Sequence, residues 1–379
     1  MNQFQKFWAG LVVVFGLSAS AFAGQLNLGV QYDGWNSNYL QPFNGWEVLA
    51  PFSLAFDLDK GIGIYAQTEF ASGHYTDSLG AATETLNLNS LSDSVIGTEI
   101  SFKSFSLPSI LNIGVNIPTG DSTWEGKQLA SNIPTEFVDS RYRGRGFGVS
   151  GFYGLSLPAG TGEFGVATGY LYSGAFIPAL GLGPASQNLK MGDSIFLALN
   201  HVQPFSSDQN ETIRLSAFYF LTTQQGGQNS IQMGPNINAS YSWSNPSALS
   251  FEVGAQAYLP GQRVDNNGNF GPEPHYSYGP RFYVSPSYAF GDFTLGGMVK
   301  YVMPNGYAVT DAFYAACYPG FLFGLDPSYR LKLDSDSALK FTASYDYIIA
   351  QNAGVDNTGA LTNVIYGYWT FGTSYEIKL

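Results

Sequence analysis

Side chains able to do catalytic chemistry are scarce in this 379-residue chain. It holds three histidines, His74, His201 and His275, and a single cysteine, Cys317. A metal centre or a Ser-His pair needs several such groups at regular spacing, and the chain has no G-x-S-x-G, C-x-x-C or P-loop pattern. The sequence therefore predicts a protein that is not an enzyme and that has no metal site and no cofactor.

The composition instead indicates a protein that contacts both lipid and water. Charged residues are 12% of the chain, against about a quarter in soluble domains, while Tyr (25), Phe (29) and Gly (45) are abundant. Mean hydropathy is only −0.02, far below that of a helical membrane protein, and a disordered chain would have few aromatics. These values favour one large β structure with one face in lipid and the other in water.

The N-terminus has the pattern of a secretory signal peptide. Lys6 precedes an apolar run over 7–17, and Ala21 and Ala23 form an A-x-A-like cleavage site. A retained transmembrane anchor is the alternative, but the run is shorter than the roughly 20 residues that a bilayer helix needs. We expect residues 1–23 to be removed and 24–379 to be exported. Loss of Lys6 leaves 15 basic and 28 acidic residues, and this balance of −13 disfavours nucleic acid as a partner.

Apolar and polar residues alternate in segments of about ten, the length that a tilted strand needs to cross a membrane. Sixteen such segments predict an all-β, transmembrane, antiparallel up-and-down barrel of about 16 strands. They lie at 25–35, 46–58, 62–72, 92–102, 109–117, 147–157, 163–172, 193–203, 212–222, 231–241, 248–258, 277–288, 292–303, 319–333, 339–349 and 365–379.

The connections between these segments alternate between short and long. The short ones have eight residues or fewer, as at 59–61 and 158–162, whereas the long ones reach 29 residues at 118–146. Outer-membrane barrels sort their loops in this way, with short periplasmic turns and long extracellular loops. We therefore expect the outer membrane of a Gram-negative bacterium as the location.

The alternation also assigns the faces of the strands. In 248–258, Leu249, Phe251 and Val253 oppose Ser250 and Glu252. Sixteen strands enclose a space too wide for side chains to fill, so the apolar face must point outward, into lipid. The polar face then lines a pore, and the predicted pore-lining charges are Glu47, Glu69, Glu99, Arg214, Glu252, Arg281, Lys300, Asp326, Arg330 and Asp346.

Acids of lumen parity come mainly from early strands, because Asp57 and Glu163 join Glu47, Glu69 and Glu99 there, whereas the bases come only from the second half of the chain. An acidic wall facing a basic wall would create a transverse field that orients polar solutes. The alternative is that these charges only keep the pore wet.

The longest connection, 118–146, carries two groups of candidate residues. Acids that narrow the pore if the connection folds inward are Asp121, Glu125, Glu136 and Asp139. Arg141, Arg143 and Arg145 share the parity of lipid-facing residues and are candidates to contact lipopolysaccharide phosphates. A bulge at the neighbouring glycines would turn them inward instead.

The segment Leu111–Asp121, a strand that ends in P-T-G-D before a long loop, resembles one in putative outer-membrane transporters of the meta-pathway phenol-degradation family. The layout of the whole mature chain resembles outer-membrane porins. Barrels of this class usually end in an aromatic residue that the barrel assembly machinery recognises, whereas this chain ends in Leu379.

The sequence predicts a porin, a passive diffusion channel for small solutes. One alternative is an uptake channel for aromatic or hydrophobic small molecules, which the resemblance and aromatics of lumen parity support, namely Tyr65, Phe218, Phe220, Tyr283 and Tyr368. A second is a structural sleeve for a partner protein. Expected partners are outer-membrane lipid, lipopolysaccharide, the assembly machinery and small solutes, and both a monomer and a homo-oligomer are compatible with the sequence.

Overall fold

The computed structural model describes residues 23–38, 44–59, 61–77, 84–120, 144–176, 188–206, 209–245, 248–275, 279–303, 319–355 and 361–378. Residues 1–22 of the predicted signal peptide lie outside these residues, and Ala23 is the first residue of the first strand. No helix within these ranges is long and apolar enough to cross a membrane.

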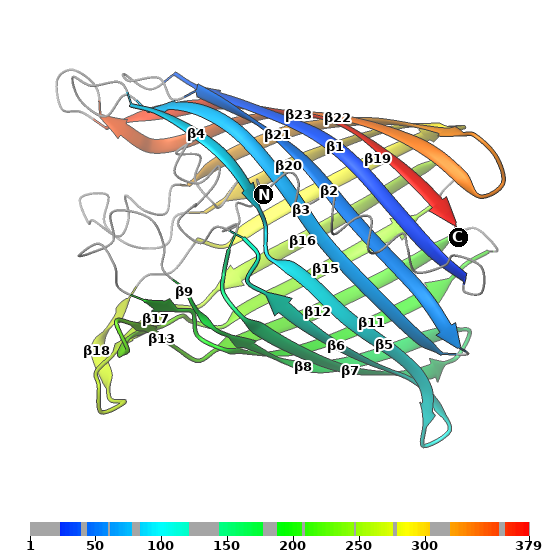
Figure 1. The fold of residues 1–379 in the computed structure, drawn as a ribbon, viewed down its shortest axis with the longest axis horizontal. Helices are drawn as coiled ribbons and strands as arrows, with labels where there is room; N and C mark the ends of the chain where they lie inside the picture. Colours follow the sequence, from blue (N-terminus) through cyan, green and yellow to red (C-terminus); the bar gives the residue numbers. More distant parts are fainter. Residues whose placement is uncertain are drawn as a thin grey trace, which may run out of the picture.

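The strands form one closed antiparallel barrel (Figure 1). β1 (Ala23–Ser37) pairs with both β2 (Asn44–Asp59) and β23 (Leu361–Lys378), which joins the two ends of the chain and closes the ring. The other strands of the ring are β3 (Ile62–Asp77), β4 (Glu84–Leu91), β5 (Ser94–Ser104), β6 (Leu107–Ile117), β7 (Gly148–Ala159), β8 (Gly162–Ser173), β11 (Ser194–Pro204), β12 (Asn210–Phe220), β15 (Asn236–Ser244), β16 (Leu249–Tyr258), β19 (Arg281–Phe290), β20 (Phe293–Val302), β21 (Gly320–Lys332) and β22 (Ser337–Val355).

Two of these strands share one place in the ring. β4 pairs with the C-terminal half of β3, at Phe70–Asp77, and β5 pairs with its N-terminal half, at Ile62–Gln67. The strand is interrupted between β4 and β5, at Ser92 and Asp93. The ring therefore has sixteen positions, and the predicted fold class and strand number are confirmed.

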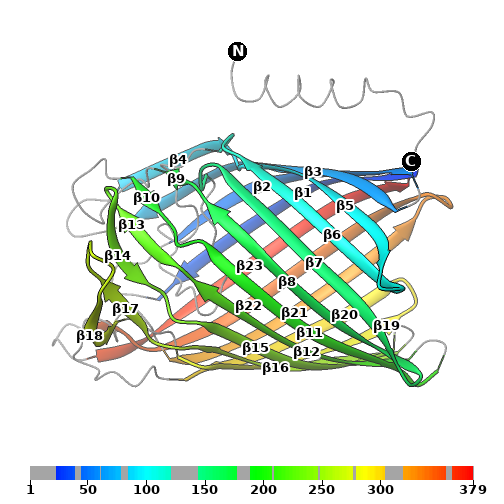
Figure 2. The same cartoon turned by 90° about the horizontal axis from the view of Figure 1, so that it is seen from below.

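A second, six-stranded sheet was not expected from the sequence. It consists of β9 (Ala175–Phe176), β10 (Leu189–Lys190), β13 (Thr222–Gln225), β14 (Gln228–Gln232), β17 (Gly261–Val264) and β18 (Phe270–His275). Figures 1 and 2 show it at one end of the barrel, on one side only. Its strands have two to six residues, too few for alternation to stand out in the sequence.

The opposite end of the barrel carries the short turns, as the loop lengths predict. Gly160 and Gly291 have φ of 65°, and Phe105 and Ser106 turn β5 into β6 with φ of 51° and 66°. In the turn before β22, the backbone N–H of Asp336 donates to Asp334 Oδ1 at 2.8 Å, and this bond holds the pKa of Asp334 below its usual value. We call this end the short-turn end and the other the long-loop end.

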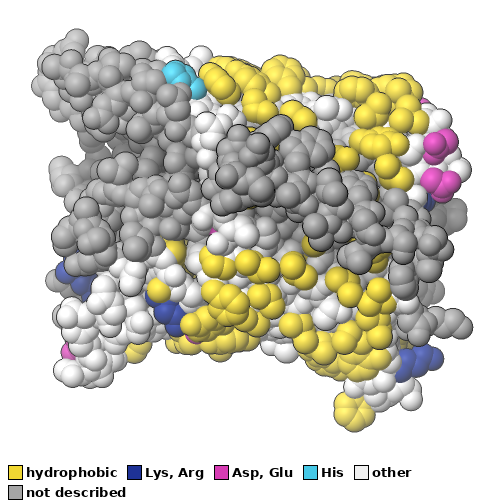
Figure 3. Space-filling model, in the orientation of Figure 1, with side chains coloured by type: hydrophobic (Ala, Val, Ile, Leu, Met, Phe, Trp, Pro, Cys, Tyr) yellow, Lys and Arg dark blue, Asp and Glu magenta, His cyan; other side chains and the backbone are white. Residues whose placement is uncertain are grey.

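The two faces of the barrel wall differ as the alternation predicts. Along β19, exposure alternates at every residue, and Phe282, Val284, Tyr288 and Phe290 are on the exposed side. Because the outer face of a barrel is convex, side chains on it spread apart and stay accessible. Figure 3 shows hydrophobic side chains over much of the outer surface of the strands.

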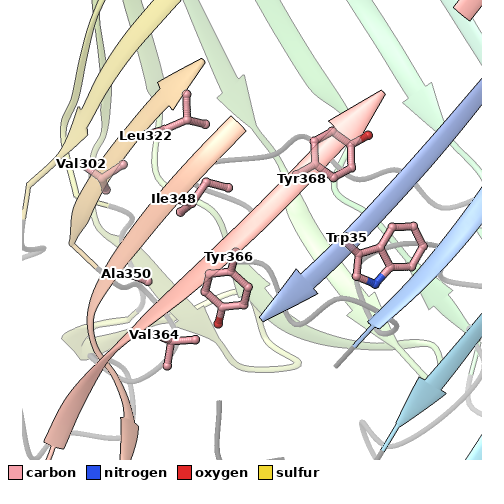
Figure 4. Packing of buried hydrophobic residues seen from close by; sticks show 8 residues of the cluster. All are labelled: Trp35, Val302, Leu322, Ile348, Ala350, Val364, Tyr366 and Tyr368. Atoms are coloured by element: carbon pink, nitrogen blue, oxygen red, sulfur yellow. The ribbon is translucent and has the colours of Figure 1, made fainter. Parts of the chain in front are cut away.

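A buried apolar cluster lies on the inward face at the long-loop end (Figure 4). It comes from β1 and β20–β23, and Trp35, Leu322 and Ile348 are each at most 2% exposed. The inner wall is thus not uniformly polar along its length. The full cluster is Trp35, Val302, Leu322, Ile348, Ala350, Val364, Tyr366 and Tyr368.

Candidate solute pathway through the barrel

The strand registers place all ten predicted pore charges on the face opposite to the exposed apolar residues. Arg214 alternates with the exposed Ile213 and Leu215, and Lys300 follows the exposed Val299. The same holds for the remaining eight. Whether these charges line the path of a moving solute stays a prediction.

One acid of this set contacts two neighbouring side chains. Glu252 on β16 accepts a hydrogen bond from Tyr283 on β19 (2.5 Å, Oε1) and contacts Arg214 on β12 (Nη1 to Oε2, 3.4 Å). The bridge spans β15 because its residue between them is the small Ser240. Gly254 leaves room for the Tyr283 ring, since a Cβ there would lie 2.3 Å from Tyr283 Cζ.

Arg281 on β19 and Lys300 on β20, two of the predicted pore-lining charges, are not cross-strand partners. Tyr283, and not Arg281, is the direct partner of Lys300. Arg281 turns toward β16, where its Nη1 donates to Gln256 Oε1 at 3.2 Å and its guanidinium lies 4.9 Å from the ring centroid of Tyr258. This orientation reduces the repulsion between the two cations.

Basic side chains gather on the inner wall at the short-turn end. Arg330 on β21 is the cross-strand partner of Lys340 on β22. Arg330 Nη2 also lies 2.8 Å from Glu376 Oε2 on β23, with 54% of the arginine side chain exposed. Since β8 stands eight positions from β22 in the ring, Glu163 on β8 lies on the wall opposite these bases.

Two fully buried acids lie at the long-loop end. Asp33 and Glu47 are cross-strand partners on β1 and β2, with 0% and 1% of their surface exposed. Asp33 Oδ1 accepts hydrogen bonds from Thr370 Oγ1 (2.7 Å) and from Gln31 Nε2 (3.0 Å). Sequence analysis selected Glu47 but missed Asp33, although the polar parity of Gln31 and Asp33 within 25–35 was a usable signal.

A cavity of about 1230 Å³ occupies the interior of the barrel. Its lining includes Glu69 on β3 and Tyr258 on β16, two strands that stand on opposite sides of the ring. The cavity therefore spans the lumen. We call it the central cavity. A second hollow of about 640 Å³ lies nearer the short-turn end and is lined by Glu163, Asn200 and Arg214 among others.

An aromatic row crosses the inner wall beside these hollows. Phe152, Phe196 and Phe218 lie at the same level on β7, β11 and β12, with Gly169 of β8 between the first two. The ring centroids are 5.5 Å apart for Phe152 and Phe196, edge to face, and 5.1 Å apart for Phe196 and Phe218. Sequence parity found only Phe218, and the register was needed to show the row.

The candidates in the longest connection are only partly described. Asp121, Glu125, Glu136, Asp139, Arg141 and Arg143 lie outside the described residues. Arg145 is described and lines the central cavity. Gly146 beside it, one of the glycines of the predicted bulge, has φ of 79°. The contact of Arg145 with lipopolysaccharide stays a prediction.

The side chains of His74 and His201 do not converge. His74 faces outward and stacks on Trp46, with ring centroids 6.2 Å apart, and Trp46 stacks in turn on Tyr32. His201 alternates with the residues of the lumen face and shares the outward side with Leu197. Among the described residues, no group of three or more His, Cys, Asp or Glu side chains is placed to hold a metal ion.

Comparison with solved structures shows the fold. OpdQ of Pseudomonas aeruginosa aligns with a TM-score of 0.51 at 12% identity, covering 94% of this chain and 98% of that one. OccAB1 of Acinetobacter baumannii aligns with a TM-score of 0.51 at 9% identity, covering 95% and 97%. OccK7 (OpdD) of Pseudomonas aeruginosa aligns with a TM-score of 0.48 at 11% identity, covering 95% and 100%. No family model and no curated protein matches the sequence.

Proposed function

We propose that the mature chain is an outer-membrane porin of a Gram-negative bacterium, through which small solutes diffuse passively. The observation that carries the proposal is the central cavity inside a closed barrel whose outer face is apolar. A barrel that places apolar side chains outside and charged ones inside is stable only where lipid surrounds it and water fills it. The long-loop end then faces the exterior of the cell.

Conductance in planar bilayers tests this function directly. Purified protein should produce stepwise ionic currents, and liposomes that contain it should swell in solutions of small sugars. Bilayers that stay silent at all protein concentrations would contradict the proposal. Co-purification of a stoichiometric protein threaded through the lumen would favour the sleeve alternative.

The aromatic row supports a second candidate, a channel that prefers aromatic or hydrophobic small molecules. Phe152, Phe196 and Phe218 offer ring faces and edges on which a flat apolar solute can stack. The charged groups of Arg214 and Glu252 lie on the same side of the lumen. Arg214 is four residues before Phe218 on β12, and Glu252 lies two strands further along the ring, on β16. Swelling rates with aromatic acids against sugars of similar mass separate the two candidates.

The partners follow from the same reading. Lipid and lipopolysaccharide surround the outer face, and the barrel assembly machinery inserts the chain after residues 1–23 are removed. The ten inward charges are proposed as pore-lining residues, and the acids of 118–146 as constriction residues. Self-association remains compatible with this proposal, and crosslinking in intact outer membranes tests it.

A further inference from the structure

A carboxylate inside the barrel ties together three segments that are distant in sequence. Asp93 Oδ2 accepts hydrogen bonds from the backbone N–H of Arg145 (2.6 Å) and from Asn116 Nδ2 (2.8 Å), and its Oδ1 accepts one from the backbone N–H of Gly120 (3.0 Å). We call Asp93, Asn116, Gly120 and Arg145 the Asp93 clamp. Charge-assisted hydrogen bonds of this kind are among the strongest in proteins.

The clamp stands at the break between β4 and β5, and the break itself is fixed. The backbone N–H of Ser92 donates to Glu69 O at 2.7 Å, and Ser92 Oγ accepts from the backbone N–H of Glu69 at 3.0 Å. Thr119 Oγ1 donates to Ser92 O at 2.9 Å. These hydrogen bonds hold the interruption between β4 and β5 in place. They therefore fix the position of the Asp93 carboxylate.

Both ends of the longest connection attach to this one carboxylate. Gly120 precedes the undescribed residues 121–143, and Arg145 follows them. Gly120 belongs to the P-T-G-D segment, which thus has a structural role here. Asn116 Nδ2 also donates to Gly146 O at 2.5 Å, and a Cβ on Gly146 would lie 2.6 Å from Ala175 O, so the backbone has little freedom to shift.

The Asp93 clamp places a cationic residue, Arg145, at the wall of the central cavity. Arg145 is exposed and lines the central cavity together with Glu69 and Tyr258. Among the described residues that line this cavity, Arg145 is the one with a cationic side chain. Three N–H groups donate to the Asp93 carboxylate, and one of them, the backbone N–H of Arg145, fixes the backbone of Arg145 at the wall of the central cavity.

We propose that Arg145 contacts the carboxylate or phosphate oxygens of anionic solutes in the channel, and that Asp93 is the positioning residue that holds Arg145 there. The inference rests on the proposed channel function. A planar guanidinium suits such oxygens because it donates two parallel hydrogen bonds. The pair was not in the set of pore residues predicted from strand parity: Arg145 precedes the predicted strand 147–157, and Asp93 was overlooked although it lies in the predicted strand 92–102 with the parity of Glu99.

Reversal potentials in a low-salt gradient test both roles, with chloride and then acetate as the anion. R145Q should lower the anion-to-cation permeability ratio by about twofold or more, since a fixed charge in a narrow aqueous path biases the local ion concentration. D93N removes a negative charge, so a purely electrostatic role would raise the ratio. Loss of positioning should lower it instead, and D93N should give no further fall when R145Q is already present.

A matched control is D265N in the loop between β17 and β18. Asp265 Oδ1 accepts from the backbone N–H of Asn267 (2.9 Å) and of Asn269 (2.8 Å), and hydrogen bonds from the Asn269 side chain and backbone lower its pKa. It resembles Asp93 chemically but lies outside the barrel wall. D265N should leave the permeability ratio unchanged.

If D93N does not fold, a cysteine substitution at Arg145 tests whether this residue lines the path of the solute. In a C317S background, R145C should react with an anionic methanethiosulfonate reagent added to the bilayer, and the current should fall. No reaction from either side would place Arg145 outside the path and overturn the inference, as would a rise in the ratio with folded D93N. A wild-type protein that gives no current would instead refute the channel function itself.

Discussion

The outward and inward faces of β19 are built to different rules. Outward, Phe282, Val284 and Phe290 are all apolar and exposed, and Phe290 packs against other outward rings, those of Tyr288 and Phe293. Inward, Arg281 and Tyr283 each have a specific partner, Gln256 and Glu252. Residues on the outer face have only to be apolar, because lipid surrounds them. The identity of each inner residue depends instead on the side chains beside it.

That contrast explains why the inner wall has zones and the outer wall has a single belt. Inside, the apolar cluster around Trp35, the aromatic row at Phe196 and the bases around Arg330 occupy different heights and strands. A water-filled lumen tolerates all three kinds of surface. Lipid tolerates only the apolar kind, and the predictions below use this difference.

The largest effect should come from a charge on the outer face. V284R, near the middle of β19, should cost about 2–4 kcal/mol of folding free energy or block assembly, because arginine must enter the hydrocarbon. Heat-modifiable mobility of outer-membrane fractions, together with urea unfolding in detergent or lipid, measures it.

The matched control is S287R on the inner face of the same strand. Ser287 faces the wet lumen, so we expect assembly at close to the wild-type level. Equal damage from both substitutions would break the assignment of faces, and with it the predicted pore residues.

A smaller effect, on transport and not on folding, is expected from the aromatic row. F196A removes the central ring, which contacts both Phe152 and Phe218, and should slow the influx of aromatic acids more than that of sugars. L197A on the outer face of the same strand is the control and should change neither rate. Parallel losses for sugars and aromatic acids in F196A would argue against a stacking role.

The cations of β19 and β20 should affect selectivity in a salt-dependent way. Replacing Arg281 and Lys300 together by Glu should shift the reversal potential toward cations at low salt. At 1 M salt, where the screening length is about 3 Å, the shift should shrink strongly. A reversal potential that stays constant at low salt would remove both residues from the conducting path.

The smallest effect should come from the ion pair at the short-turn end. Arg330 is 54% exposed beside Glu376, so R330Q should change the free energy of unfolding by less than about 1 kcal/mol. The difference should vanish as salt rises. A loss of several kcal/mol would mean that this wall is more shielded from water than its exposure indicates.

The sequence by itself determined the class of fold, the sixteen positions of the ring, the sorting of the connections and the alternation of faces along the barrel strands. It did so because alternation with a period of two is a local property, and a strand in a membrane repeats it over ten residues. Glu252 and Arg281, for example, were assigned to the inner face from their immediate neighbours alone.

Only the tertiary structure decided which inward residues meet. The contact of Arg214 with Glu252 depends on the register across β15, and the row of Phe152, Phe196 and Phe218 depends on three pairings. Arg145 is the sharpest case, because strand parity directs it outward, whereas Gly146 and the Asp93 carboxylate bring it to the central cavity. Register and backbone turns are set by contacts between distant segments, and a local sequence pattern therefore cannot predict them.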